Sequence, residues 1–170
     1  MVKFGSKVLV SLTFLLSGCS SIDCPLNNNV RMVSQLYSAE TLEALSLTQA
    51  ELNITAAGTD SLLLNRWTGS GTFSVPLSYR SEPDTLLLHF SNNQGQFATD
   101  SLIVSHTATP HFENIDCPVV VFHQLSHVRW TSHPLRELPL TIDSVVISRN
   151  LVDYEDLENL RIYLRAVATQ

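Results

Sequence analysis

Two copies of the tetrapeptide Ile-Asp-Cys-Pro contain the residues best suited to chemistry, Cys24 and Cys117. Redox catalysis usually needs two cysteines close in sequence, as in Cys-x-x-Cys, and zinc needs further ligands at a recognisable spacing. Neither pattern surrounds these two residues. In an oxidising compartment such a pair forms a disulfide by default. A structural disulfide is therefore the favoured interpretation, with free thiols and a metal site as the alternatives.

Three histidines in and after the longest apolar run are the candidate metal ligands: His123, His127 and His133. On a strand, residues four apart point to the same side but lie about 13 Å apart, too far for one ion unless a bulge intervenes. Ordinary strand and loop histidines are the favoured interpretation. We expect neither a metal nor a cofactor.

Other catalytic patterns are missing from the sequence. It contains no Gly-x-Ser-x-Gly and no phosphate-binding glycine loop. The acidic segment 153–159 offers oxygen ligands for calcium, but it lacks the alternating ligands and the central glycine of an EF-hand loop. A solvated turn is the favoured interpretation of this segment. We therefore predict that the protein is not an enzyme.

A second repetition has the form Asp, hydroxyl residue, aliphatic residue. In the structural interpretation, the aspartate ends a turn by bonding nearby backbone N–H groups, and an apolar run then enters the sheet. The form also resembles the acceptor motif for O-glycosylation of exported proteins in some anaerobic Gram-negative bacteria. The candidate acceptors are Ser61, Thr85, Ser101 and Ser144.

The N-terminal residues are typical of an export signal. Two lysines precede an apolar run at 8–16 that is too short to cross a bilayer as a helix. The segment 16–19, Leu-Ser-Gly-Cys, then matches the bacterial lipobox. We predict a lipoprotein signal peptide over 1–18, acylation of Cys19, and a mature domain over 19–170. An ordinary cleaved secretory peptide is the alternative.

The charge of the remaining chain limits its partners. Both lysines lie in the leader, so the rest carries eight arginines against sixteen acids, a formal net charge of −8. This balance argues against nucleic acid and against a polybasic contact with anionic lipid. Residues 20–23 lack both an aspartate directly after Cys19 and an early acidic run. We predict an outer-membrane location in a bacterial cell envelope, facing either the periplasm or the surface.

The body of the chain is typical of β-structure. Short runs with alternating apolar residues are separated by Gly, Pro or Asn at close intervals, which predicts hairpins. The expected fold is a single antiparallel β-sandwich, immunoglobulin-like, with about nine strands. A short helix or a turn is expected at 39–45. The candidate strands are 30–37, 51–56, 62–67, 73–79, 85–90, 97–105, 119–130, 142–148 and 160–164.

Several segments together resemble a family of small uncharacterised lipoproteins of gut anaerobic Gram-negative bacteria. Besides the lipobox and the two cysteines, they are 59–65, 75–79, 119–123 and 158–163. The resemblance implies an envelope location and brings no catalytic residues.

The leading hypothesis for function is a non-enzymatic binding or assembly module of the envelope. It would be held to the membrane by its N-terminal lipid, with another envelope protein or a glycan as partner. The alternative is an envelope hydrolase or a carbohydrate-active accessory protein, which would bring histidines and carboxylates together in one cleft.

Overall fold

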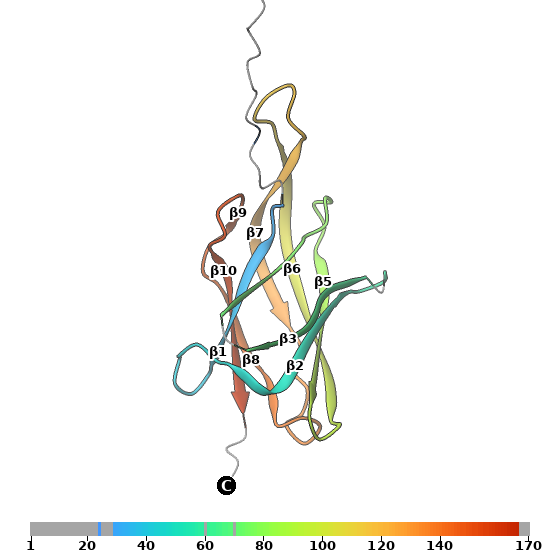
Figure 1. Ribbon diagram of the computed structural model, residues 1–170, viewed down its shortest axis with the longest axis vertical. Coiled ribbons are helices and arrows are strands. Elements are labelled where there is room, and N and C mark those ends of the chain that lie inside the picture. Colours follow the sequence, from blue (N-terminus) through green and yellow to red (C-terminus); the bar gives the residue numbers. More distant parts are fainter. Residues whose placement is uncertain (1–23, 25–28, 60, 70, 167–170) are drawn as a thin grey trace, which may run out of the picture.

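Ten strands form two sheets that pack against each other in a sandwich (Figure 1). The computed structural model describes residue 24 and residues 29–59, 61–69 and 71–166. Its all-β class confirms the fold predicted from the alternating runs. The segment 39–45 forms a turn, in which Leu42 N–H donates to Ser38 O at 2.9 Å. Within the described residues, no helix has the length and apolar character needed to cross a membrane.

The smaller sheet has four strands in the order β4-β1-β10-β8. Its strands are β1 (Met32–Ser38), β4 (Thr72–Val75), β8 (Leu140–Ile147) and β10 (Glu158–Ala166). The larger sheet has six strands in the order β3-β2-β5-β6-β7-β9. Its strands are β2 (Leu47–Ala56), β3 (Leu62–Gly69), β5 (Asp84–Asn92), β6 (Phe97–His111), β7 (Val120–Trp130) and β9 (Leu151–Val152).

One pairing differs from the antiparallel arrangement that the sequence predicts. Strands β1 and β10 run parallel, with Leu36 opposite Ile162. A tight hairpin forces neighbouring strands to be antiparallel, but these two strands lie at opposite ends of the described chain and no hairpin joins them. The additional strand β9 has only two residues, too few to show an alternating pattern.

The core lies between the two sheets and follows the alternation of the sequence. Leu86, Leu88 and Phe90 of β5 are at most 2% exposed, and Leu160 and Ile162 of β10 are at most 1% exposed. Burying each such side chain contributes about 1.5–3 kcal/mol relative to leaving it in water. The apolar period of two therefore selects both the strand conformation and the inward face.

Strand β6 determines how far apart the two ends of the sandwich lie. It has 15 residues, which span about 50 Å at the usual rise of a strand. Figure 1 shows the β6–β7 hairpin reaching the top of the view, whereas the β5–β6 turn and the β7–β8 connection lie at the bottom. The candidate sites described below lie at these two ends.

Candidate functional site

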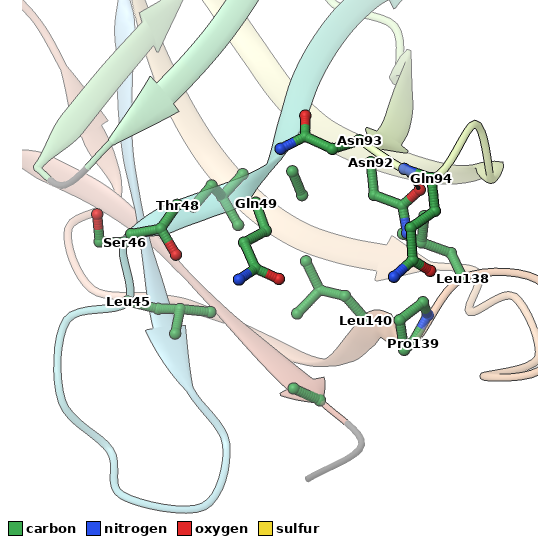
Figure 2. A pocket seen from close by; sticks show the side chains of 13 residues that line it. Leu45, Ser46, Thr48, Gln49, Asn92, Asn93, Gln94, Leu138, Pro139 and Leu140 are labelled. Carbon is green, nitrogen blue, oxygen red and sulfur yellow. Dashed lines mark hydrogen bonds between the residues drawn. The ribbon is translucent and has the colours of Figure 1, made fainter. Parts of the chain in front are cut away.

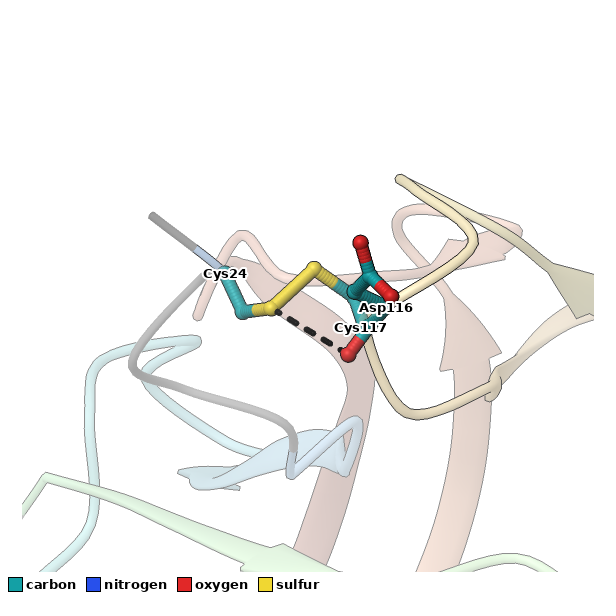
Figure 3. The surroundings of a disulfide bond; sticks show 3 residues. All are labelled: Cys24, Asp116 and Cys117. Atoms are coloured by element: carbon teal, nitrogen blue, oxygen red, sulfur yellow. Dashed lines mark hydrogen bonds between the residues drawn. A yellow bond between two sulfur atoms is a disulfide. The ribbon is translucent and has the colours of Figure 1, made fainter. Parts of the chain in front are cut away.

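A disulfide joins Cys24 to Cys117 at the end formed by the β6–β7 hairpin (Figure 3). The two Cα atoms lie 5.6 Å apart and the residues are 93 positions apart in sequence. Cys24 Sγ also lies 4.0 Å from the backbone oxygen of Asp116, a contact without a shared proton because a disulfide sulfur carries none. The bond is the pairing that the sequence predicted. Cys19 lies outside the described residues, so its acylation stays a prediction.

The loop 112–119 at this hairpin exposes apolar side chains. Phe112 is 66% exposed, Ile115 95% and Val119 52%. The backbone N–H of Cys117 donates to Asn114 O at 3.1 Å, which closes a β-turn with Ile115 at its second position. This turn directs the isoleucine away from the sheets. We call this loop, together with Cys24, the tether end.

An aromatic cluster supports the base of the tether end. The rings of His111 and Phe122 stack with centroids 4.2 Å apart, and Tyr154 meets Phe122 edge-on at 5.0 Å. Glu113 Oε1 bonds His111 Nε2 at 2.9 Å. These contacts join β6, β7 and the loop after β9, so the hairpin is held in place up to the residue before the exposed loop.

The opposite end of the sandwich contains a pocket of about 510 Å³ (Figure 2). Three connections surround it: the β1–β2 loop with the start of β2, the β5–β6 turn, and the β7–β8 connection. None of the described residues that line it is charged. We call it the distal pocket, and it is lined by Leu45, Ser46, Leu47, Thr48, Gln49, Ala50, Asn92, Asn93, Gln94, Leu138, Pro139, Leu140 and Ala166.

The distal pocket has an apolar interior and a polar rim. Leu47 is 5% exposed and Leu138 1%, so these two leucines belong to the core of the sandwich, whereas Leu45 and Leu140 are half-buried against it. The rim includes the β5–β6 turn, where Asn92 Oδ1 accepts from the backbone N–H groups of Gln94 and Gln96 at 3.0 and 3.1 Å. Gly95 has φ 78° in this turn, which suits glycine. Amides in fixed turns are thus placed around an apolar surface.

A polar chain crosses the interior of the larger sheet. Asp84 Oδ2 bonds His106 Nε2 at 3.1 Å, and His106 Nδ1 lies 3.2 Å from His123 Nδ1. In the tautomer of His106 that donates Nε2–H to Asp84, His106 Nδ1 accepts a hydrogen bond from Nδ1–H of His123. Burial, reinforced by the neighbouring His106, lowers the pKa of His123 to about 4. His123 is therefore neutral at pH 7.

A bulge separates two of the predicted metal ligands. Ser105 pairs with His127, but His106 pairs with Leu125, so Ser126 is an extra residue in β7. The alternation reverses there: His123 is 2% exposed, whereas His127 lies on the outer surface. The expectation that His123 and His127 share a side is therefore wrong, because the sequence pattern does not reveal the bulge.

His133 lies in a different polar pair. Its Nδ1 bonds Asp100 Oδ2 at 2.9 Å, and its backbone N–H donates to Asp100 Oδ1 at 2.7 Å. Thr141 Oγ1 donates to the backbone oxygen of His133 at 2.8 Å. The two bonds to the aspartate fix the loop after β7 against β6. The structure thus distributes the three candidate histidines over separate surroundings.

No metal-binding cluster forms in the part of the chain that the structure describes. There, no group of three or more His, Cys, Asp or Glu side chains is placed to hold an ion. In the acidic segment 153–159, Arg149 bonds Asp153 through two nitrogens at 3.0 and 2.8 Å and Glu155 at 2.9 Å. Burial raises the pKa of Asp153, but the bonds from Arg149 outweigh it and leave that pKa below its usual value. An arginine is thus the partner of these carboxylates.

The four candidate glycosylation sites differ in accessibility. Ser61 is exposed at the start of β3, whereas Thr85, Ser101 and Ser144 are half-buried within β5, β6 and β8. Two of the aspartates in these motifs, Asp84 and Asp100, bond the histidines described above. Asp84 Oδ2 also accepts from the nearby backbone N–H of Ser78 at 2.6 Å, as the structural interpretation expects, whereas Asp100 lies within β6 and bonds the distant His133. Glycosylation stays a prediction that Ser61 suits best.

The matched family covers most of the sandwich. The sequence profile of a family of unknown function, DUF6452, matches residues 51–164, from β2 into β10. The chain belongs to this family. None of the curated proteins and none of the solved structures with which the chain was compared matches it. The matched region includes both histidine sites and Cys117, but it excludes Cys24.

Sequence reasoning missed the distal pocket and the polar chain. The pocket is assembled from three connections distant in sequence, so no local pattern indicates it. The polar chain left one signal: His106 and His123 occur at apolar positions of alternating runs, where an inward histidine needs a buried partner.

Proposed function

We propose that this chain is a lipid-anchored envelope protein whose distal pocket binds an uncharged peptide segment of another envelope protein. Two features support the anchor. One is the lipobox at 16–19, and the other is the disulfide formed by Cys24, which follows the lipobox by five residues. Both are typical of a protein exported to an oxidising compartment. The pocket supplies the binding surface.

The observation that carries the proposal is the composition and place of the distal pocket. Of the residues that the structure describes, thirteen line it and none of these bears a charge, although the chain outside the leader carries sixteen acids against eight arginines. A pocket without charge selects against charged ligands, because desolvating a charge without a partner costs several kcal/mol. The pocket also opens at the end of the sandwich away from the disulfide, where an anchored protein can reach a partner.

A peptide segment matches the lining better than a charged or purely apolar ligand. The amide side chains of Gln49, Asn93 and Gln94 each donate and accept hydrogen bonds. A peptide backbone likewise presents both donors and acceptors, and its apolar side chains can contact the leucines. Of the described pocket residues, none is aromatic, so the lining has no flat ring for a sugar to lie on.

Photo-crosslinking in native envelopes tests this proposal. Thr48 is exposed at the pocket rim, so a benzoylphenylalanine there should capture a protein of defined size. Adding Leu140→Glu to the same chain should remove the adduct, because a carboxylate then faces the uncharged pocket. The same crosslinker at Thr107, an exposed strand threonine outside the pocket, should give no such adduct. Equal capture at both positions, or capture of glycan alone at Thr48, would contradict the proposal.

A second candidate is an envelope hydrolase or carbohydrate-active accessory protein, and one observation favours it. Asp84, the acid of the polar chain, also lines a second pocket of about 520 Å³ between the region where β2 turns into β3 and the segment 76–86 that leads into β5. Turnover of ester, peptide or glycoside substrates that is lost in Asp84→Asn but kept in Asp100→Asn would establish this candidate.

A further inference from the structure

The exposed apolar side chains at the tether end lie in one short loop. Phe112, Ile115 and Val119 are each more than half exposed, and all three lie within eight residues. Single exposed apolar residues are common, but a cluster at the tip of a projecting hairpin indicates a surface that something covers. The β-turn at 114–117 points Ile115 outward, which no core contact requires.

The disulfide places the predicted anchor beside this loop. Cys117 belongs to the loop and is bonded to Cys24, five residues after Cys19. Five residues span at most about 17 Å when fully extended. The acyl chains on Cys19 can therefore enter the membrane only close to the tether end. A bilayer surface is the one apolar partner that must lie within reach of these side chains if Cys19 is acylated.

The charge of the loop indicates the kind of lipid. Its ionisable side chains are Glu113 and Asp116, and it contains no lysine or arginine. Glu113 bonds His111 at the base of the loop. Two acids without a basic residue are repelled by anionic headgroups, so contact must be driven by the apolar side chains. Zwitterionic lipid is the matching surface.

We propose that the tether end is a membrane-docking wedge, with Phe112, Ile115 and Val119 entering the headgroup and acyl boundary of zwitterionic lipid beside the Cys19 anchor. This inference rests on the proposed lipid anchor. The aromatic cluster under the loop holds the base of the wedge on β6 and β7, and the disulfide joins the wedge to Cys24. The sandwich would then stand on the membrane with the distal pocket about 50 Å from it, the length of β6.

Depth-dependent fluorescence quenching tests the wedge in the full chain. Intact-mass analysis first establishes whether Cys19 is acylated, and the protein is then placed in phosphatidylcholine vesicles with brominated acyl chains. Ile115→Trp adds an indole at the wedge, and Phe97→Trp adds one at the far end of β6, where Phe97 is 76% exposed. The spectrum of the unsubstituted chain is subtracted to remove Trp67 and Trp130.

We expect the added indole of Ile115→Trp to shift to shorter wavelength and to lose about half its emission to brominated lipid. The added indole of Phe97→Trp should lose almost none. Equal, negligible quenching at both positions in acylated protein would overturn the wedge and leave the anchor intact.

An unmodified Cys19 would instead overturn the anchor. Its free thiol is then coupled to a maleimide-bearing phospholipid, and the same quenching comparison decides the wedge separately. Quenching of Ile115→Trp in the coupled protein would support the wedge, and its absence would overturn it.

Discussion

The two ends of this sandwich differ in where they place their apolar side chains, although both are built on the same strands. The tether end exposes Ile115 and its apolar neighbours and is fixed by a covalent bond. At the distal pocket, Leu47 and Leu138 lie in the core, Leu45 and Leu140 are half-buried, and the amides of Asn92, Asn93 and Gln94 lie at the β5–β6 turn. An exposed apolar loop suits a surface that excludes water, whereas an amide rim over leucines suits a partner that exchanges hydrogen bonds.

The loops at the two ends are also held in place by different interactions. At the distal pocket, the β5–β6 turn continues directly from paired strands, and the β7–β8 connection is held by the two bonds from His133 to Asp100. The loop 112–119 extends past the paired region of β6 and β7, where sheet bonds no longer hold it. The disulfide instead joins this loop covalently to Cys24.

Removing the disulfide should give the largest effect on stability. The bond closes a loop of 93 residues, and chain entropy gives roughly 4–5 kcal/mol for a loop of that size. Denaturant unfolding of Cys117→Ser should show this loss, with Cys19→Ser as the matched control that keeps the bond. A loss below about 1 kcal/mol would show that the bond does not constrain the unfolded chain as this account requires.

Acid should destabilise the region between the two ends. His123 has a folded pKa of about 4, below its ordinary value of 6.5. Between pH 6.5 and pH 4 the His123 ring is protonated in the unfolded chain but neutral in the folded one. The contribution of this ring to the free energy of unfolding is therefore complete above pH 6.5 and is lost as the pH falls towards 4. The shift corresponds to roughly 3 kcal/mol. Unfolding at pH 7.5 and pH 4 in wild type and in His123→Gln measures the difference.

The His123→Gln variant separates this group from the carboxylates that also titrate in acid. Its stability should fall less between the two pH values than that of wild type. Identical losses in both chains would show that His123 is not buried as a neutral ring.

Polar substitution of the wedge should have the smallest effect on folding. Because Phe112 and Ile115 are mostly exposed, their joint replacement by serine should change the free energy of unfolding by less than about 0.5 kcal/mol. The matched replacement of Phe90, which is fully buried, should cost about 3–5 kcal/mol. A large cost at the wedge would mean that these side chains serve the fold and not a membrane.

The sequence predicted the parts of this molecule that depend on local patterns. Alternation in 160–164 and 85–90 identified inward faces, because a period of two leaves no other face for the apolar residues. The disulfide followed from the two cysteines because the predicted export signal implies an oxidising compartment. The two-residue strand β9 and the parallel β1–β10 pairing have no such local signal, since both depend on which strands meet in space.

The candidate sites depend even more on contacts that no local sequence pattern indicates. The His123–His127 interpretation failed because a single inserted residue, Ser126, reverses the alternation of β7. The distal pocket joins residues from 45 to 166, and only folding brings these together. The exposure of Ile115 likewise depends on where the hairpin ends, since an apolar residue in sequence is more often buried.

One crosslinking comparison in native envelopes tests the central claim that the two ends have different partners. Identical photo-crosslinkers are placed at Ile115 and at Thr48, and the mass of each adduct is measured. We predict phospholipid adducts at Ile115 and a protein adduct at Thr48. A protein adduct at Ile115 with no lipid, or lipid adducts at Thr48, would contradict it.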